Sequence, residues 1–101
     1  MKIPFEKLDK AFENRLRLQI MSVLVANQRY DFNSLKELLA VTDGNLASHL
    51  KGLEREGYIL VNKSFLGRKP NTNYEATDKG KTAFKNHLDT LEQLINQQKI
   101  K

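Results

Sequence analysis

The chain has 101 residues, of which 40% are hydrophobic and 29% are charged, a composition typical of one folded domain and not of a disordered segment. Lys and Arg number 17 against 12 Asp and Glu, and the resulting net charge of +5 favours anionic partners. The chain lacks cysteine, which excludes disulfides and thiolate metal sites, and lacks any apolar run near the roughly 18 to 20 residues that span a bilayer, so we expect a cytoplasmic protein without a membrane partner.

The N-terminal residues 1–13 are expected to form a helical arm, because Phe5, Leu8 and Phe12 share one apolar stripe. Asn14 then offers a cap for helical residues that continue to about Ala26. Whether the arm and this stretch are one bent helix or two pieces is left open. The second stretch is apolar over more than half of its circumference, which predicts a central core helix.

Two shorter elements follow. Residues 27–32 form an extended link that can pair as a minor strand. Residues 32–40 then predict a helix, with Asn33 or Ser34 as its cap. The leucines expected to point inward from this helix are Leu35, Leu38 and Leu39.

The next helix is expected over residues 43–57, with Thr42 or Asp43 as the cap and Gly57 as the stop. Leu46, Leu50 and Leu53 form its apolar stripe. The opposite face collects small polar groups and cations, with His49 on its flank: Asn45, Ser48, Lys51, Gly52 and Arg55. Two helices joined by so short a link indicate a helix-turn-helix. An ordinary helical hairpin with a solvated polar face fits these residues equally well.

A β-hairpin is expected after Gly57, with strands over residues 58–64 and 72–76. Gly67 and Pro70 punctuate the turn over residues 65–71, and they place Arg68 and Lys69 at its tip.

A last helix is expected from the cap Thr77 through residues 78–101. Apolar residues recur along it at spacings of four, three and four, and a short seam of this kind either docks on the chain's own core or pairs with a second copy. Three helices and a hairpin already use the core-facing surface of so small a chain, which favours pairing with a second copy. The arm is the natural complement of this seam. The expected dimerisation residues are therefore Phe5, Leu8, Phe12, Phe84, Leu88, Leu91, Leu94 and Ile95.

These elements give the sequence a resemblance to small winged-helix transcriptional regulators related to the MarR and ArsR groups. The residues that carry it are L-x-x-H-L-x-x-L-E-x-x-G-Y-[IV] from Leu46 to Ile59, G-R-x-P-x-T-x-Y-x-x-T-x-x-G from Gly67 to Gly80, and RLRLQIMSVL near the N-terminus. The resemblance implies a mainly α fold with a small antiparallel β-wing (α+β), a winged helix-turn-helix. Residues 1–101 would form one domain, with its core at 14–76 and a dimerisation helix at 77–101.

The resemblance also implies a homodimer that binds double-stranded DNA and controls transcription, usually as a repressor. Helix 43–57 would enter the major groove of a pseudo-palindromic operator, and the wing tip, residues 65–72, would lie on the adjacent minor groove or backbone. Asn45 would meet an adenine edge, Ser48 and His49 bases or phosphate, and Lys51 and Arg55 phosphates. The full expected DNA-binding set is Thr42, Gly44, Asn45, Ser48, His49, Lys51, Arg55, Arg68, Lys69 and Asn71.

Simpler roles exist for several of these side chains. Asn45 can be a first-turn capping partner only, His49 a partly buried flank residue, and Arg68 with Lys69 a solvated turn. The main rival function is a winged-helix adaptor or subunit that binds protein and has no DNA specificity of its own. An adaptor is expected to carry apolar anchors on the face from Asn45 to Arg55, and that face has none.

Catalysis, metals and cofactors have little support. No His or Cys stands beside a plausible acid partner, and no phosphate-binding glycine loop occurs, so we predict no catalytic residues. ArsR-type metal sensing needs clustered ligands, whereas His49 and His87 fall on different helices, so we expect no metal or other cofactor. Only one helix follows the hairpin, so a MarR-type pocket for a small-molecule effector is expected to be small or absent.

Overall fold

The computed structural model describes residues 5–99; residues 1–4 and 100–101, the ends of the expected arm and last helix, lie outside the described residues. The described part is mainly helical with one small antiparallel sheet, which confirms the predicted fold class. Its elements are η1 (Phe5–Lys7), η2 (Lys10–Phe12), α1 (Arg15–Ala26), β1 (Tyr30–Asp31), α2 (Phe32–Leu39), α3 (Asp43–Arg55), β2 (Ile59–Leu66), β3 (Lys69–Ala76) and α4 (Asp78–Lys99).

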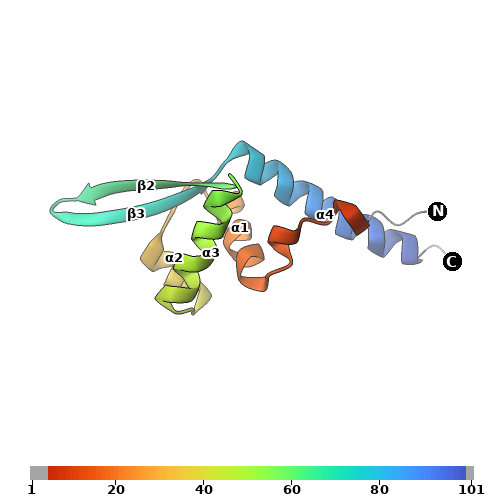
Figure 1. Cartoon of the computed structure of the whole chain (residues 1–101), viewed down its shortest axis with the longest axis horizontal. Coiled ribbons are helices and arrows are strands. Elements are labelled where there is room, and N and C mark those ends of the chain that lie inside the picture. The colour runs from red at the N-terminus through yellow and green to blue at the C-terminus, as the bar shows by residue number, and fades with distance from the viewer. Residues whose placement is uncertain (1–4, 100–101) are drawn as a thin grey trace.

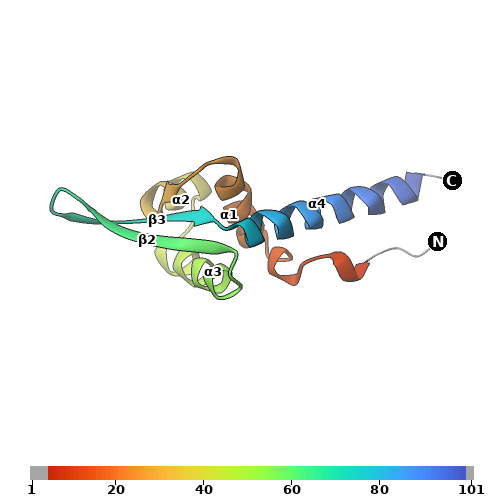
Figure 2. The ribbon, with the colours of Figure 1, turned by 90° about the horizontal axis from the view of Figure 1, so that it is seen from above.

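The molecule is elongated, with extents of 61 × 25 × 20 Å. The β2–β3 hairpin projects from one end of the central helices, and α4 projects from the other end (Figure 1). Both views place the N-terminal segment beside α4, so η1 and the far part of α4 lie at the same pole (Figure 2).

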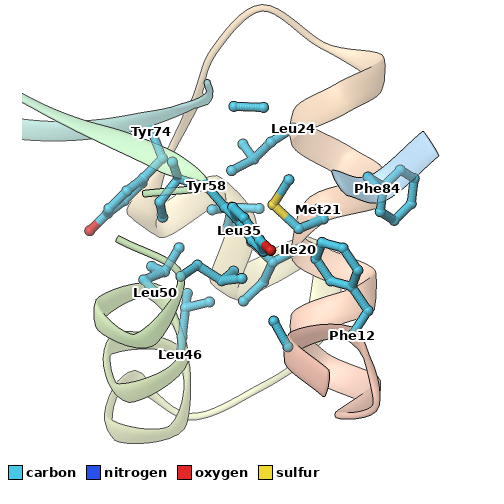
Figure 3. Close-up of a cluster of buried hydrophobic side chains, with 14 residues drawn as sticks. Phe12, Ile20, Met21, Leu24, Leu35, Leu46, Leu50, Tyr58, Tyr74 and Phe84 are labelled. Atoms are coloured by element: carbon cyan, nitrogen blue, oxygen red, sulfur yellow. The ribbon is translucent and has the colours of Figure 1, made fainter. Parts of the chain in front are cut away.

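The core lies between α1, α2, α3 and the inner end of the hairpin (Figure 3). As the leucine spacing of α3 predicted, Leu46, Leu50 and Leu53 all point into this core. The largest fully buried side chains are Ile20, Met21, Leu24, Leu35, Leu46, Leu53 and Ile59.

The N-terminal arm is not the regular helix that the apolar spacing predicted. It consists of two short 3₁₀ turns, and Asp9 caps the second by accepting a hydrogen bond from the Ala11 N–H at 2.9 Å. Asn14 then caps α1 by accepting one from the Arg17 N–H at 3.0 Å. Two successive caps break the backbone hydrogen-bond ladder, so the arm and α1 are separate pieces.

Helix α2 departs from the prediction in its cap and in one leucine. Asp31 is the cap, in place of Asn33 or Ser34, because its carboxylate accepts bonds from both the N–H and the hydroxyl of Ser34. These bonds hold the pKa of Asp31 below its ordinary value. Leu38, expected inside, is 55% exposed. At about 100° per residue it lies on the side of the buried Leu35 away from Leu39, and that side faces solvent.

The sheet has the strand order β1-β3-β2. The predicted link strand is confirmed as β1, whose Tyr30 pairs with Tyr74. The hairpin is longer than predicted, because β2 continues to Leu66 and β3 begins at Lys69. The turn is therefore Gly67 and Arg68 alone, with Gly67 at φ +66°. Pro70 is tolerated within β3 because β1 pairs only with residues 73–74, which leaves that edge open at Pro70.

Helix α3, the hairpin and α4 meet at one backbone junction. Gly57 at φ +78° ends α3, with its N–H bonded to the Glu54 carbonyl and the Tyr58 N–H bonded to the Leu53 carbonyl. Thr77 returns to the same point: its N–H donates to the Tyr58 carbonyl at 3.0 Å and its hydroxyl to the Gly57 carbonyl at 2.7 Å. The Thr77 hydroxyl oxygen also accepts from the Gly80 N–H at 2.9 Å, which confirms Thr77 as the cap of α4.

The N-terminal segment packs on this junction and on α4. The Phe12 ring lies 5.6 Å from the ring of Phe84 and 5.5 Å from that of Tyr58. The Tyr58 hydroxyl donates to Asp9 at 2.5 Å, and the Asp9 N–H donates to the buried His87 Nδ1 at 3.0 Å. Burial and the Asp9 carboxylate raise the pKa of Tyr58 to about 12. Phe12 and Phe84, expected to contact a second copy, are thus buried within this chain instead.

We predict that Gly80→Ala destabilises the fold, because a Cβ at Gly80 would overlap the backbone carbonyl of Tyr58. The free energy of unfolding should fall by about 1 to 3 kcal/mol, the usual range for overpacking. Gly44→Ala is the matched control, because a Cβ at Gly44 meets nothing within 4 Å, and alanine should be neutral or stabilising by up to about 1 kcal/mol. Urea unfolding followed by circular dichroism measures both. Equal stability of the two variants would show that the junction relaxes freely.

Candidate functional site

The start of α3 has a side-chain cap, and its one acidic residue is paired with a lysine. The Thr42 hydroxyl oxygen accepts a hydrogen bond from the Asn45 N–H at 3.3 Å, so Thr42 is the cap and the Asn45 side chain stays exposed. Asp43, the one acid in the first turn, pairs with Lys36 of α2 at 2.7 Å. Gly44 has open space beside its Cα. Another molecule can therefore come close to the backbone at this helix start.

The exposed face of α3 contains four of the five side chains predicted for it, namely Asn45, Ser48, Lys51 and Arg55. Gly52, the fifth predicted member, is buried and lies inside. The guanidinium of Arg17 from α1 lies against it, at the place where a side chain on residue 52 would project. Glycine at this position lets α1 and its arginine approach α3 closely.

His49 lies on the flank of α3 and is half buried, in agreement with the simpler of its two predicted roles. The Arg17 Nε–H donates to His49 Nδ1 at 3.1 Å. Because Nδ1 accepts this bond, the ring hydrogen of His49 sits on Nε2. His49 can therefore offer one N–H donor to another molecule, and Arg17 fixes the orientation of the ring.

A cleft of about 350 Å³ separates α3 from the inner face of the hairpin. Leu50, Val61 and Tyr74 supply its apolar walls, and Lys51 and Lys63 contribute a cation from each side. Burial, followed by the nearby charge of Glu54, raises the pKa of Tyr74, so its phenol is protonated at neutral pH. The remaining lining residues are Ala47, Ser48, Glu54 and Thr72.

Sequence reasoning missed Lys63 and Thr72 as members of this site. Lys63 follows Val61 by two residues and so shares its side of β2, a period-two signal that was available. Thr72 required knowledge of the register, in which it pairs with Lys63. The same alternation places Asn71, predicted for the site, on the opposite face of the hairpin.

The cations around the cleft and at the hairpin tip are exposed and form no close ion pair, although the Glu54 carboxylate also lines the cleft. Among the described side chains, those of residues 5–96, the ion pairs are Arg29–Glu75, Lys36–Asp43 and Lys85–Asp89. None of these involves a cation of the exposed face of α3 or of the hairpin beyond its base. The side chains left with positive charge there are Lys51, Arg55, Lys63, Arg68 and Lys69.

Residues 5–99 hold no group of three or more His, Asp or Glu side chains placed to bind a metal ion. Among the helices of these residues, none combines the length and the apolar character needed to cross a bilayer.

Comparison with known proteins places this geometry in context. The sequence matches the family model of a winged helix DNA-binding domain over residues 16–95, which confirms the predicted relationship. It is 40% identical over 85 residues to an uncharacterized protein of Methanocaldococcus jannaschii, covering 84% of this chain and 92% of that one.

Two solved structures show the same architecture. A transcriptional regulator homologue from Pyrococcus horikoshii superposes with a TM-score of 0.85 at 33% identity, covering 95% of this chain and 96% of that chain. MepR of S. aureus, solved as a DNA complex, superposes with a TM-score of 0.74 at 18% identity, covering 94% of this chain and 81% of that chain. The second likeness is one of fold alone.

Proposed function

Because the chain belongs to the winged helix DNA-binding domain family, we propose that it is a homodimeric transcriptional repressor that reads a pseudo-palindromic operator. Helix α3 enters the major groove, and the wing tip, residues 65–72, lies on the adjacent minor groove. One observation carries the proposal: α3 and the hairpin present unpaired cations from the two sides of one cleft. A protein bound to its operator blocks other proteins from the same duplex, which makes repression the simplest outcome.

In this proposal, the first turns of α3 read the DNA bases. Asn45 is exposed there, and its amide can form the paired donor and acceptor bonds that adenine offers in the major groove. Ser48 stands one turn further on, and His49 presents its Nε2–H beside it. The missing side chain at Gly44 lets the positive end of the helix approach a phosphate oxygen.

The cations of α3 and the hairpin contact the DNA backbone in this proposal. A DNA strand that separates the major groove at α3 from the minor groove at the wing tip would run along the cleft, past Lys51 and Lys63. Arg55 extends the exposed face of α3 toward its C-terminal end. Lysine and arginine at such positions supply affinity and orientation without sequence preference. The DNA complex of the structurally similar MepR supports duplex DNA as the partner.

The adaptor alternative finds less support from α3. A protein-binding face is expected to present large apolar anchors at its centre. The exposed large apolar side chains of residues 5–99 are Phe5, Leu38, Leu60, Phe65, Leu66, Leu88, Leu91 and Ile95, so none of them belongs to α3.

The dimer contact is proposed for one face of α4. Phe84, Leu88, Leu91 and Ile95 share one stripe of α4, and Leu94 lies at its edge. Phe84, near the start of the helix, is buried in the core and Leu94 is buried too, whereas Leu88, Leu91 and Ile95 are 44%, 37% and 56% exposed. Phe5 at 59% exposure and the half-buried Leu8 lie in the N-terminal segment, whose first turn packs on α4. Pairing two copies through the exposed stripe would present two α3 helices to one duplex, with half-sites roughly 34 to 36 Å apart.

Selection of bound fragments from random duplexes, at two salt concentrations, tests the proposal. We expect recovered duplexes with two inverted half-sites whose centres are about 10 to 11 base pairs apart. Asn45→Ala should relax the preference at one position of each half-site and preserve the spacing. Recovery of no preferred sequence at either salt concentration would favour the adaptor alternative.

Loss of the cations at the wing tip should weaken binding to all duplexes about equally. For Arg68→Ala with Lys69→Ala, the slope of log K against log salt should fall by about 1 to 2 units per protomer, because fewer phosphates are neutralised. Lys81→Ala with Lys85→Ala removes the same charge from exposed positions on α4 and should leave most of the slope intact. Equal effects of the two double variants on the salt slope would show that the wing tip is not part of the contact surface.

Leu91→Asp should give monomers, because it places a charge within the proposed apolar contact. Gln93→Asp introduces the same charge at an exposed position about 200° around α4 and should leave the dimer intact. Light scattering coupled to size-exclusion chromatography measures both masses. A dimeric Leu91→Asp variant would place the contact between copies elsewhere.

A further inference from the structure

The register of the hairpin assigns every side chain near its tip to one of two faces. Side chains alternate along a strand, and paired residues share a face. One face begins in the core with Ile59 opposite Ala76 and continues with Val61 opposite Tyr74. Lys63 opposite Thr72 comes next and lines the cleft with α3. Phe65 opposite Pro70 completes this inner face at the tip.

The tip of the inner face is apolar and uncovered. The Phe65 side chain is 70% exposed, and Pro70 beside it is exposed as well. Leu66, the next residue, is 68% exposed but points to the outer face, opposite Lys69. Two adjacent apolar side chains with nearly equal exposure thus face opposite ways, and only Phe65 faces the side where the α3 cleft lies.

The charge around Phe65 selects an anionic partner. From Gly57 to Tyr74 the chain contains no Asp or Glu, whereas it contains Lys63, Arg68 and Lys69. An apolar protein partner would not need this positive surround. A polyanion with apolar sugar surfaces matches both the charge and the aromatic ring.

We propose that Phe65, supported by Pro70, contacts the deoxyribose walls and base edges of the DNA minor groove. This inference rests on the proposed function, because α3 must occupy the neighbouring major groove. Phe65 stands four residues beyond Val61, about 13 Å along an extended strand. That length is comparable with the major-groove width of roughly 12 Å, so the tip can cross one backbone strand to the next groove. Phenylalanine and proline are among the residues that contact or wedge the minor groove in other DNA-binding proteins.

The test compares Phe65→Ala with Leu60→Ala on a 30-base-pair duplex recovered by the selection described above. Leu60 is 53% exposed and lies on the outer face of β2, opposite Glu75 and outside the wing tip. For Phe65→Ala we expect binding at least about 10-fold weaker, because burial of an aromatic ring is lost at each of two tips. The salt slope should stay unchanged, because no phosphate contact is removed. The affinity of Leu60→Ala should stay within about 2-fold of that of the original protein. Thermal unfolding checks that both variants remain folded, as their exposure leads us to expect.

Hydroxyl-radical footprinting supplies a second readout, because these radicals attack deoxyribose hydrogens that are accessible in the minor groove. Protection outside the two half-sites should be lost with Phe65→Ala and kept with Leu60→Ala. Unchanged affinity and footprint of Phe65→Ala would overturn the inference, and the proposed function would still stand if the Arg68 and Lys69 variant lowers the salt slope. Equal losses of affinity for Phe65→Ala and Leu60→Ala, or a change of oligomeric state in Phe65→Ala, would overturn it too. Failure of the original protein to select any duplex would reject the proposed function itself.

Discussion

The backbone contact between Gly57–Tyr58 and Thr77–Gly80 determines how the rest of the molecule is arranged. At this point α3 ends, β2 begins, β3 ends and α4 begins, and the Thr77 side chain bonds both sides of the contact. Glycine is required twice, at Gly57 for its positive φ and at Gly80 for the close passage of the Tyr58 carbonyl. Because α3, the hairpin and α4 all leave from this junction, their relative directions follow from a few hydrogen bonds and two missing side chains.

Features that depend on neighbours in sequence could be predicted. Three such features are the cap Thr77, the leucine stripe of α3 and the stop at Gly57. Each depends on residues of its own helix, so each can be recognised in the sequence without knowledge of the tertiary structure. Features that depend on packing between distant segments could not be predicted from the sequence. The arginine that fills the space over Gly52 comes from α1, and the partner that makes Thr72 part of the cleft is set by the strand register.

The spacing of apolar residues identifies a face but not what covers it. Phe12 and Phe84 were expected to face a second copy, yet they pack against each other at 5.6 Å within the chain. Leu38 shares the helical spacing of Leu35 and Leu39 but points to solvent, because α2 is only eight residues long and one flank has no neighbour. In both cases the competing factor is tertiary contact, which the order of apolar residues along one helix does not contain.

The two exposed apolar regions differ in their electrostatic surroundings, and this difference separates their proposed roles. The stripe of Leu88, Leu91 and Ile95 on α4 is interspersed with Asp89 and Glu92, whereas the tip at Phe65 has only cations near it in sequence. The two regions project from opposite ends of a molecule 61 Å long. The Debye length at physiological salt is about 8 Å, so the charges at one end are screened from the other end. A polyanion is therefore attracted more strongly to the hairpin end, where cations stand without acids, than to the α4 end, where both signs occur. The α4 stripe is then available to pack against the same stripe of a second copy. This pairing brings the positively charged hairpin ends of two copies to one duplex.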